Sequence, residues 1–182
     1  MTLAKGLTPV PAATLKSFDN TPFQVRSVGD DNPLLTVTCS GKTEETDDAS
    51  LAKLQAIAGH ITELDLGRSQ VTDAACATIA KMPRLTRLDL RQTTVGDGGI
   101  KALSACKELR SLNLFGTKVG DYSLLALQAL PQLERLYVWQ SKVTAKGVVR
   151  LREKRPGLRV VFAADLPEPN EDAGNSQPRR RR

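Results

Sequence analysis

Few side chains in this sequence are suited to catalysis or metal binding: the thiols of Cys39, Cys76 and Cys106 and the imidazole of His60. The cysteines are odd in number and none lies in a CxxC or CxxCH arrangement, which argues against a disulfide framework. With one histidine, a histidine-based metal site or a Ser-His-Asp triad lacks its components. The sequence also holds no phosphate-binding loop and no nucleophile elbow. We therefore expect a protein that is not an enzyme, with no catalytic residues, no metal site and no cofactor.

The composition is that of a water-soluble domain. The chain has 182 residues, of which 40% are hydrophobic and 25% charged, and its formal net charge is +6. No apolar run approaches the ~20 residues that a membrane helix needs, so we expect no membrane insertion. The first seven residues contain no apolar stretch of signal-peptide length. As written, the chain is expected in the cytoplasm, or outside it if the sequence is a fragment of a longer exported protein.

A 24-residue period reveals the elements that position these side chains. Rows beginning at Ile61, Leu85, Leu109 and Leu133 align, and a fifth begins at Leu158 after one extra residue. We number the columns from the first residue of each row, so that Leu64 stands in column four of the first row. Columns four, six and eleven are apolar in all four full rows. They hold Leu64, Leu66, Val71, Leu88, Leu90, Val95, Leu112, Leu114, Val119, Leu136, Val138 and Val143. This is the LxxLxL pattern of a leucine-rich repeat.

Each row predicts one strand and one short helix. The alternation at columns four and six points both side chains to one face, as in a strand. Later apolar residues fall three apart, which makes one stripe along a helix. Asp73, Asp97 and Asp121 stand where a helix N-cap is expected. In the fourth row Ala145 breaks that column, and Thr144 is the expected cap.

The predicted fold is an α/β leucine-rich-repeat solenoid with a curved parallel sheet inside and short helices outside, because neighbouring repeats must bury each other's apolar faces. We expect about four full repeats and degenerate caps. The expected divisions are an N-terminal segment of little pattern (1–22), a cap with a degenerate repeat (23–60), the repeats with a C-terminal cap strand (61–163) and a disordered tail (164–182) that ends in four arginines.

The rows resemble a bacterial leucine-rich-repeat family whose repeats read LxxLxLxxTxVTDxGLxxLxxLPx. Residues 112–119 and 136–144 look like the closing repeats attached to c-type cytochrome domains in some of those proteins. The resemblance covers about residues 23–163 and implies the solenoid fold. The haem-attaching CxxCH is absent, so haem binding is not carried over. A related pattern occurs in the repeats of F-box proteins, but no F-box segment is found upstream.

The column assignments also predict which polar groups are structural. Cys76 and Cys106 occupy otherwise apolar columns, so we expect both in the core, and Cys39 buried as well. His60 shares its column with charged and polar residues, and we expect it to face solvent rather than bind a ligand. Column nine carries hydroxyls that we expect to satisfy backbone groups at a turn, with a ligand-binding row as the alternative. These residues are Ser69, Thr93, Thr117 and Ser141.

Strand columns three, five and seven point away from the core, toward the concave face. Because parallel strands lie ~4.8 Å apart, equal columns form ladders. Phe115, Tyr137 and Trp139, three of the chain's seven aromatic residues, then cluster near the C-terminal end, flanked by Arg91 and Arg135. Exposed aromatic side chains with arginine are typical of binding hot spots, so these five are the predicted partner-binding residues. The alternative is that Phe115 and Trp139 stack on each other with Arg91 over a ring, as surface packing.

Three functions remain open. The first is a non-catalytic protein-binding or scaffolding module that uses the concave face, with a protein partner and an oligomeric state that the sequence does not identify. The second is a structural appendage of a larger c-type-cytochrome-related redox or envelope protein. The third is a weak binder of nucleic acid or an acidic partner, because residues 133–157 hold seven basic and two acidic residues, a net charge of +5, and the tail ends in arginines. Asp65 and Asp89 resemble a carboxylate pair, but they are more simply neighbours of Arg87 and Arg91.

Overall fold

The computed structural model describes residues 3–30, 32–39 and 41–162, and it confirms the predicted leucine-rich-repeat solenoid. The tail predicted to be disordered, residues 164–182, lies outside the described residues. Strands that follow one another in sequence pair side by side in a single seven-stranded sheet. They are β1 (Gln24–Ser27), β2 (Leu35–Thr38), β3 (Ile61–Asp65), β4 (Arg87–Asp89), β5 (Ser111–Asn113), β6 (Arg135–Tyr137) and β7 (Arg159–Val161).

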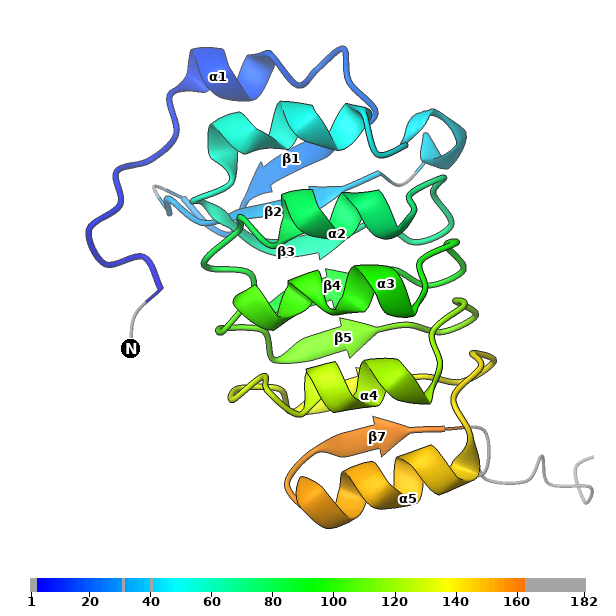
Figure 1. Cartoon of the computed structure of the whole chain (residues 1–182). Helices are drawn as coiled ribbons and strands as arrows, with labels where there is room; N and C mark the ends of the chain where they lie inside the picture. Colours follow the sequence, from blue (N-terminus) through cyan, green and yellow to red (C-terminus); the bar gives the residue numbers. More distant parts are fainter. Residues whose placement is uncertain (1–2, 31, 40, 163–182) are drawn as a thin grey trace, which may run out of the picture.

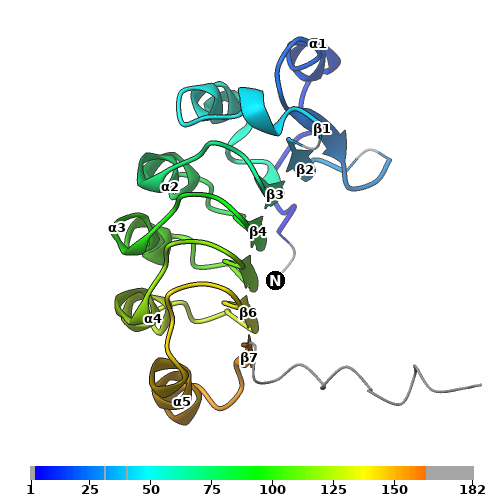
Figure 2. The ribbon, with the colours of Figure 1, turned by 90° about the vertical axis from the view of Figure 1, so that its right-hand side faces the viewer.

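Short helices cover the outer side of the solenoid (Figure 1), and Figure 2 shows helices along one side and strand ends along the other. The α-helices are α1 (Ala12–Lys16), α2 (Asp73–Ile79), α3 (Asp97–Ile100), α4 (Asp121–Leu127) and α5 (Ala145–Lys154). The 3-10 helices are η1 (Thr43–Glu45), η2 (Ser50–Ile57) and η3 (Ala102–Ala105). The second full repeat, which begins at Leu85, has a broken helix, α3 followed by η3. Gly98 and Gly99 lower the helix propensity there.

The leucine columns form the core between sheet and helices. From β3 to β6 the strands pair in parallel with equal columns opposite each other, as in Leu88 opposite Leu112 and Leu112 opposite Leu136. The column residues Leu64, Leu88, Leu112 and Leu136 are all buried, with exposed fractions of 2% or less. A buried leucine contributes roughly 1.5–3 kcal/mol, so each repeat stabilises the next one mainly through this stack.

The N-terminal end is closed by an antiparallel hairpin. β1 pairs with β2, and between them Asn32 N donates to the carbonyl of Gly29 at 3.1 Å, in agreement with the turn that the Gly, Asn and Pro residues there predict. Phe18 and Phe23 are buried against the core at this end, and α1 precedes them. The segment 1–22, expected to carry little pattern, thus supplies a helix and a buried aromatic ring.

The aspartates predicted as helix N-caps are not caps. The cap positions are held by Thr72, Gly96 and Gly120, one residue earlier, and the aspartates begin the helices. Their carboxylates instead accept hydrogen bonds from the following repeat: Gly96 N donates to Asp73 at 2.6 Å, and Gly120 N donates to Asp97 at 2.8 Å. Aspartate at this position therefore links repeats through otherwise unpaired backbone donors. For α5, the helix of the fourth row, the predicted cap is confirmed, because Thr144 Oγ1 accepts from Gly147 N at 3.1 Å.

The fifth row was predicted with the wrong register. An extra residue before Leu158 would place Val160 on the concave face, but the structure pairs Arg159 with Arg135 and Val160 with Leu136, which keeps the 24-residue spacing. Val160 is buried and Arg159 exposed. Leu158 is buried, one position away from the column that it was assigned to.

Two columns shape the turn after each strand. Column eight has positive φ in every repeat: Arg68 (65°), Gln92 (53°), Gly116 (66°) and Gln140 (54°). In column nine each hydroxyl donates to the carbonyl three residues earlier, at 2.6–2.7 Å, which confirms the predicted turn role. The hydroxyls of this column are thus used within the turn rather than held out for a ligand.

Candidate functional site

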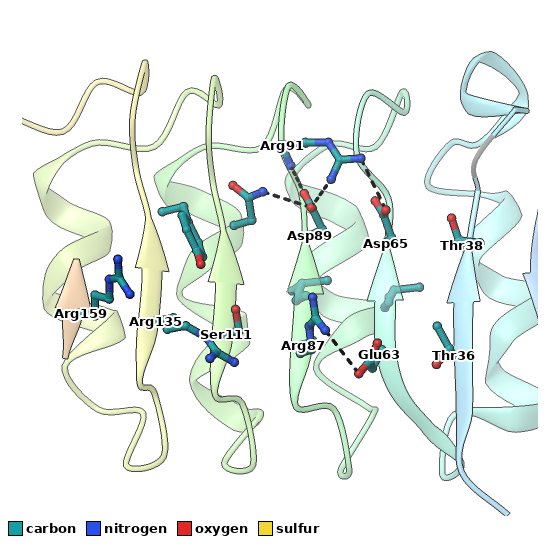
Figure 3. A pocket seen from close by; sticks show the side chains of 14 residues that line it. Thr36, Thr38, Glu63, Asp65, Arg87, Asp89, Arg91, Ser111, Arg135 and Arg159 are labelled. Atoms are coloured by element: carbon teal, nitrogen blue, oxygen red, sulfur yellow. Dashed lines mark hydrogen bonds and ion pairs between the residues drawn. The ribbon is translucent and has the colours of Figure 1, made fainter. Parts of the chain in front are cut away.

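The concave face is a shallow hollow of about 710 Å³ that runs across the strands from Thr36 and Thr38 to Arg159. Figure 3 shows the ladder side chains that line it, all projecting from the sheet. Columns three and five supply most of the lining, as the strand alternation predicts. The lining changes along this hollow, from charged side chains in its N-terminal half to aromatic side chains in its C-terminal half.

The N-terminal half is a network of paired charges. Arg91 contacts the carboxylate of Asp89 in its own repeat and lies 3.5 Å from Asp65 in the preceding one. Arg87 lies 3.7 Å from Glu63 (Figure 3). Each of these five charged side chains therefore has an opposite charge beside it. We call these five residues the charge network.

The carboxylates of the charge network also hold the backbone. Asp65 Oδ1 accepts from Gly67 N at 2.9 Å, and Asp89 Oδ1 accepts from Arg91 N at 2.9 Å. Gly67 is required by this arrangement, because a Cβ there would lie 2.9 Å from the Arg91 side chain. The two aspartates thus accept backbone hydrogen bonds in the turns, which was not predicted. Both are neighbours of Arg91, as predicted, whereas Arg87 pairs with Glu63 instead.

The C-terminal half is built from aromatic side chains. Phe115 and Trp139 lie in register on neighbouring repeats, with ring centroids 5.2 Å apart and an interplanar angle of 38°. Together with Tyr137, Val161 and Asn113 they line a mainly apolar hollow of about 220 Å³. All three rings are partly exposed. We call Phe115, Tyr137, Trp139 and Val161 the aromatic cluster.

Two arginines stand beside this cluster without acidic partners. Arg135 and Arg159 are opposite each other on β6 and β7, and both are exposed. Among the described residues, no carboxylate lies within ion-pair distance of either (Figure 3). Glu134, next to Arg135 in the chain, points elsewhere and pairs with Arg110 at 3.1 Å. Two like charges in adjacent rungs repel each other, so this part of the face attracts anions.

Four of the five sequence-predicted residues lie together. Phe115, Tyr137 and Trp139 share the apolar hollow, and Arg135 lies on the same strand as Tyr137. Arg91 instead faces the N-terminal half and is held by Asp65 and Asp89, so it does not lie over an aromatic ring.

Sequence reasoning missed Arg159 and Val161. The assumed extra residue in the fifth row moved both out of the concave columns. The signal that would have found them is the 24-residue spacing from Leu136 to Val160, which continues the column-four ladder.

The residues first considered for chemistry are structural. The three cysteines are buried and free, as predicted. Burial raises the pKa of the Cys76 thiol to about 12 and that of the Cys106 thiol to about 11, so both stay protonated at neutral pH. His60 is only partly exposed, and its Nδ1 lies 2.9 Å from the carbonyl oxygen of Pro33 in the hairpin turn, which ties that turn to the first full repeat.

Within the part of the chain that the structure describes, no group of three or more His, Cys, Asp or Glu side chains is placed to hold a metal ion. None of the helices described between residues 3 and 162 combines the length and apolarity needed to cross a bilayer.

Comparison with known proteins gives the same fold. Residues 81–104 match the family model described as Leucine Rich repeat. No curated protein sequence matches the chain significantly. An internalin, InlF, from Listeria monocytogenes is similar with a TM-score of 0.52 and 20% identity, over 65% of this chain and 32% of the internalin. A chain of the Drosophila melanogaster SNF/U2A′ complex is similar with a TM-score of 0.53 and 15% identity, over 86% of this chain and 83% of that one.

The chain thus spans about a third of the internalin that it matches. At these identities the likenesses show the fold and no more. The repeat geometry, the matched repeat model and both solved structures agree that the protein is a leucine-rich-repeat solenoid.

Proposed function

We propose that this protein is a non-catalytic protein-binding or scaffolding module whose partner docks on the C-terminal half of the concave face. The observation that carries the proposal is that the partly exposed aromatic cluster lies next to Arg135 and Arg159, which have no acidic partners among the described residues. Aromatic and arginine side chains are the residues most enriched in binding hot spots. Leucine-rich-repeat solenoids commonly bind proteins on their extended concave surfaces, and one of the two similar solved chains is itself part of a protein complex.

The charge network favours the C-terminal half as the docking site. An incoming charged group at Arg87 or Arg91 must compete with Glu63, Asp65 or Asp89, which already occupy those guanidinium groups. At Arg135 and Arg159 no such competition exists within the described residues. Of the five residues predicted from sequence, we therefore retain Phe115, Arg135, Tyr137 and Trp139 at the centre of the site. Arg91 falls at its edge.

The site defines the chemistry of the partner surface. Arg135 and Tyr137 are two residues apart on one strand, which separates their side-chain positions by about 7 Å. The partner should offer an apolar side chain for the hollow between the rings and one or two carboxylates at about that distance for the arginines. A carboxylate bridging Arg135 and Arg159 would also relieve their mutual repulsion.

A cross-linking capture tests the proposal. The wild-type protein is compared with a Phe115→Ala, Trp139→Ala double variant and with a matched control, Asp89→Asn, which alters the other half of the same face. The proposal expects one partner protein to be captured by the wild type and by the control and lost with the double variant. Thermal melting of the wild type and both variants shows that all three proteins are folded.

Equal capture by all three proteins would contradict the proposal, as would capture of no partner by any of them. The paired rings would then serve only to pack neighbouring repeats. The expectation of a structural appendage to a larger protein, which so far rests on the cytochrome-attached resemblance alone, would take its place.

A further inference from the structure

The outer face of the solenoid carries an apolar patch that packing does not explain. Large hydrophobic residues that remain mostly exposed are rare in the described chain. Three of the four, Tyr122 (80% exposed), Leu125 (59%) and Val149 (53%), lie on α4 and α5. These helices stack next to each other at the C-terminal end of the row of helices (Figure 1). An exposed cluster of this kind differs from single scattered apolar residues, which need no explanation.

The repeats themselves provide a control. The positions equivalent to Tyr122 in the other full repeats hold Ala74, Gly98 and Lys146, and those equivalent to Leu125 hold Ala77, Lys101 and Val149. Val149 belongs to the patch itself, and the equivalent positions outside the patch hold only small or charged residues. Large apolar side chains here are not required by the repeat fold.

The patch borders a hollow. A space of about 290 Å³ lies between α4 and α5, with Tyr122, Leu125 and Gln128 on the α4 side and Gly147 and Arg150 on the α5 side. The carboxylate of Asp121 also lines it, but this carboxylate already accepts hydrogen bonds from the backbone N and the hydroxyl of Thr144. Leu124 and Leu151, which belong to the core, form part of its lining. A hollow between two neighbouring helices, with apolar side chains along one wall, is the shape that accepts the apolar stripe of another helix.

One basic side chain, Arg150, lines the hollow, and it belongs to a basic row on the exposed side of α5. Lys146, Arg150 and Lys154 follow one another at four-residue spacing, so they lie on one side of α5, and Arg150 shows that this side borders the hollow. All three are exposed, and among the described residues none has a carboxylate within ion-pair distance.

Two neighbouring arginines already bond the backbone. Arg155 donates to the carbonyls of Gln128, Leu130 and Leu133, and Arg152 donates to that of Val160. These two arginines therefore have a structural role that separates them from the row Lys146, Arg150 and Lys154.

We propose that the hollow between α4 and α5 is a second docking surface, which takes an amphipathic helix with an acidic edge. Its apolar stripe would lie against Tyr122 and Leu125, and its carboxylates would face the row Lys146, Arg150 and Lys154. This surface is on the opposite face of the repeats from the aromatic cluster, so it does not depend on the function proposed above. A solenoid with both surfaces would hold two proteins at once.

The test uses fluorescence anisotropy with labelled synthetic peptides. The acidic probe is an 18-residue amphipathic helix with leucines along one stripe and glutamates at the remaining positions. The matched probes replace every glutamate with lysine, or scramble the acidic sequence so that the stripe is lost. The proteins are the full chain, a Tyr122→Ser, Leu125→Ser double variant, Arg150→Glu, and Trp139→Ala as the control for the other face.

The proposal expects the acidic amphipathic peptide to bind the wild type and Trp139→Ala equally. Its affinity should fall about tenfold or more with either outer-face variant. The lysine and scrambled peptides should bind at least about tenfold more weakly than the acidic one. Because the substituted side chains are mostly exposed, the melting temperatures should stay unchanged.

Three results would overturn the proposal. One is equal binding of the lysine and acidic peptides, and another is binding that the outer-face variants leave unchanged. The third is a lack of peptide binding together with another interaction. Retention on vesicles of anionic phospholipid would mean that the patch faces a lipid surface, and concentration-dependent dimerisation in sedimentation would mean that it faces a second copy of the chain.

Discussion

The two halves of the concave face present the same strand columns in contrasting ways. In the N-terminal half, the column positions hold Glu63, Asp65, Arg87, Asp89 and Arg91, which pair with one another. In the C-terminal half, the same columns hold the aromatic cluster and Arg135 and Arg159, which have no acidic partners among the described residues. One backbone ladder thus carries a surface that satisfies itself and a surface that leaves apolar area and positive charge to be covered. The difference separates residues that pair with one another within the solenoid from the residues of the proposed binding site.

The largest expected effect is unfolding of the middle repeats, which would disrupt both halves of the concave face. Leu112, fully buried in β5, lies where the halves meet. Leu112→Asp places a carboxylate in the core, and we expect a loss of about 4 kcal/mol or more in the free energy of unfolding, with unfolding of the middle repeats. Circular dichroism and urea denaturation measure this loss. Ser111→Asp, one residue away on the concave side, is the matched control and should remain folded. An unchanged spectrum and melting temperature for Leu112→Asp would refute the shared core.

The second prediction concerns binding alone. The Phe115→Ala, Trp139→Ala variant should weaken partner binding by about 2–4 kcal/mol, because the rings supply most of the apolar area of the site. Its free energy of unfolding should also fall, because the ring pair contributes ~0.5–1.5 kcal/mol in addition to the area that the partly exposed rings bury, but the variant should remain folded. Calorimetry with the captured partner gives the affinity. A loss of stability as large as the loss of affinity would assign the rings to packing instead.

The third prediction concerns a variant of the charge network that should lose stability and change little in partner binding. Asp89 accepts hydrogen bonds from Arg91 N and from Asn113 Nδ2 and pairs with the Arg91 guanidinium. Asp89→Ala should therefore reduce the free energy of unfolding by about 1–2 kcal/mol, because it leaves these donors without an acceptor. Partner affinity should fall much less than in the double variant, because Asp89 reaches the proposed site only through its hydrogen bond with Asn113. A variant of normal stability and impaired binding would reverse the assignment of the two halves.

The smallest effect concerns the buried thiols. Burial raises the pKa of Cys76 from an ordinary 9.0 to about 12 and that of Cys106 to about 11. The folded state then holds more protons than the unfolded state above pH 9, so the stability contributed by these thiols is fully present below that pH and is lost as the pH rises through the folded values.

At pH 8, alkylation of the native protein should therefore proceed only through opening of the structure. The cysteines lie in the repeats beneath the N-terminal half, so Asp89→Ala should speed their labelling while Phe115→Ala, Trp139→Ala should not. Mass spectrometry of timed samples measures the rates. Equal acceleration by both variants would mean that the halves open as one unit.

The solenoid could be predicted from sequence because four aligned rows state the same pattern independently, and Leu88, Leu112 and Leu136 fall where the period places them. Side-chain roles that depend on the neighbouring repeat were harder. Asp97 looks like an N-cap within its own row, but its carboxylate bonds Gly120 of the following one.

The same limit applies to the candidate site. The aromatic cluster followed from the columns alone, whereas the direction of Arg91 did not. An arginine has long, flexible reach, and the space above Gly67 lets it turn to Asp65 and away from Phe115. Arg159 was missed because a single assumed insertion shifts a strand by one residue, and such a shift exchanges its two faces.

The most direct test of binding at the aromatic cluster uses the chain's single tryptophan, Trp139. Labelling with 5-fluorotryptophan gives one ¹⁹F resonance at the centre of the proposed site. We predict that this resonance shifts or broadens as the captured partner is added and saturates with the same affinity that calorimetry gives. An unchanged resonance in a sample where sedimentation shows the complex fully formed would contradict the account, because the partner would then be bound elsewhere on the solenoid.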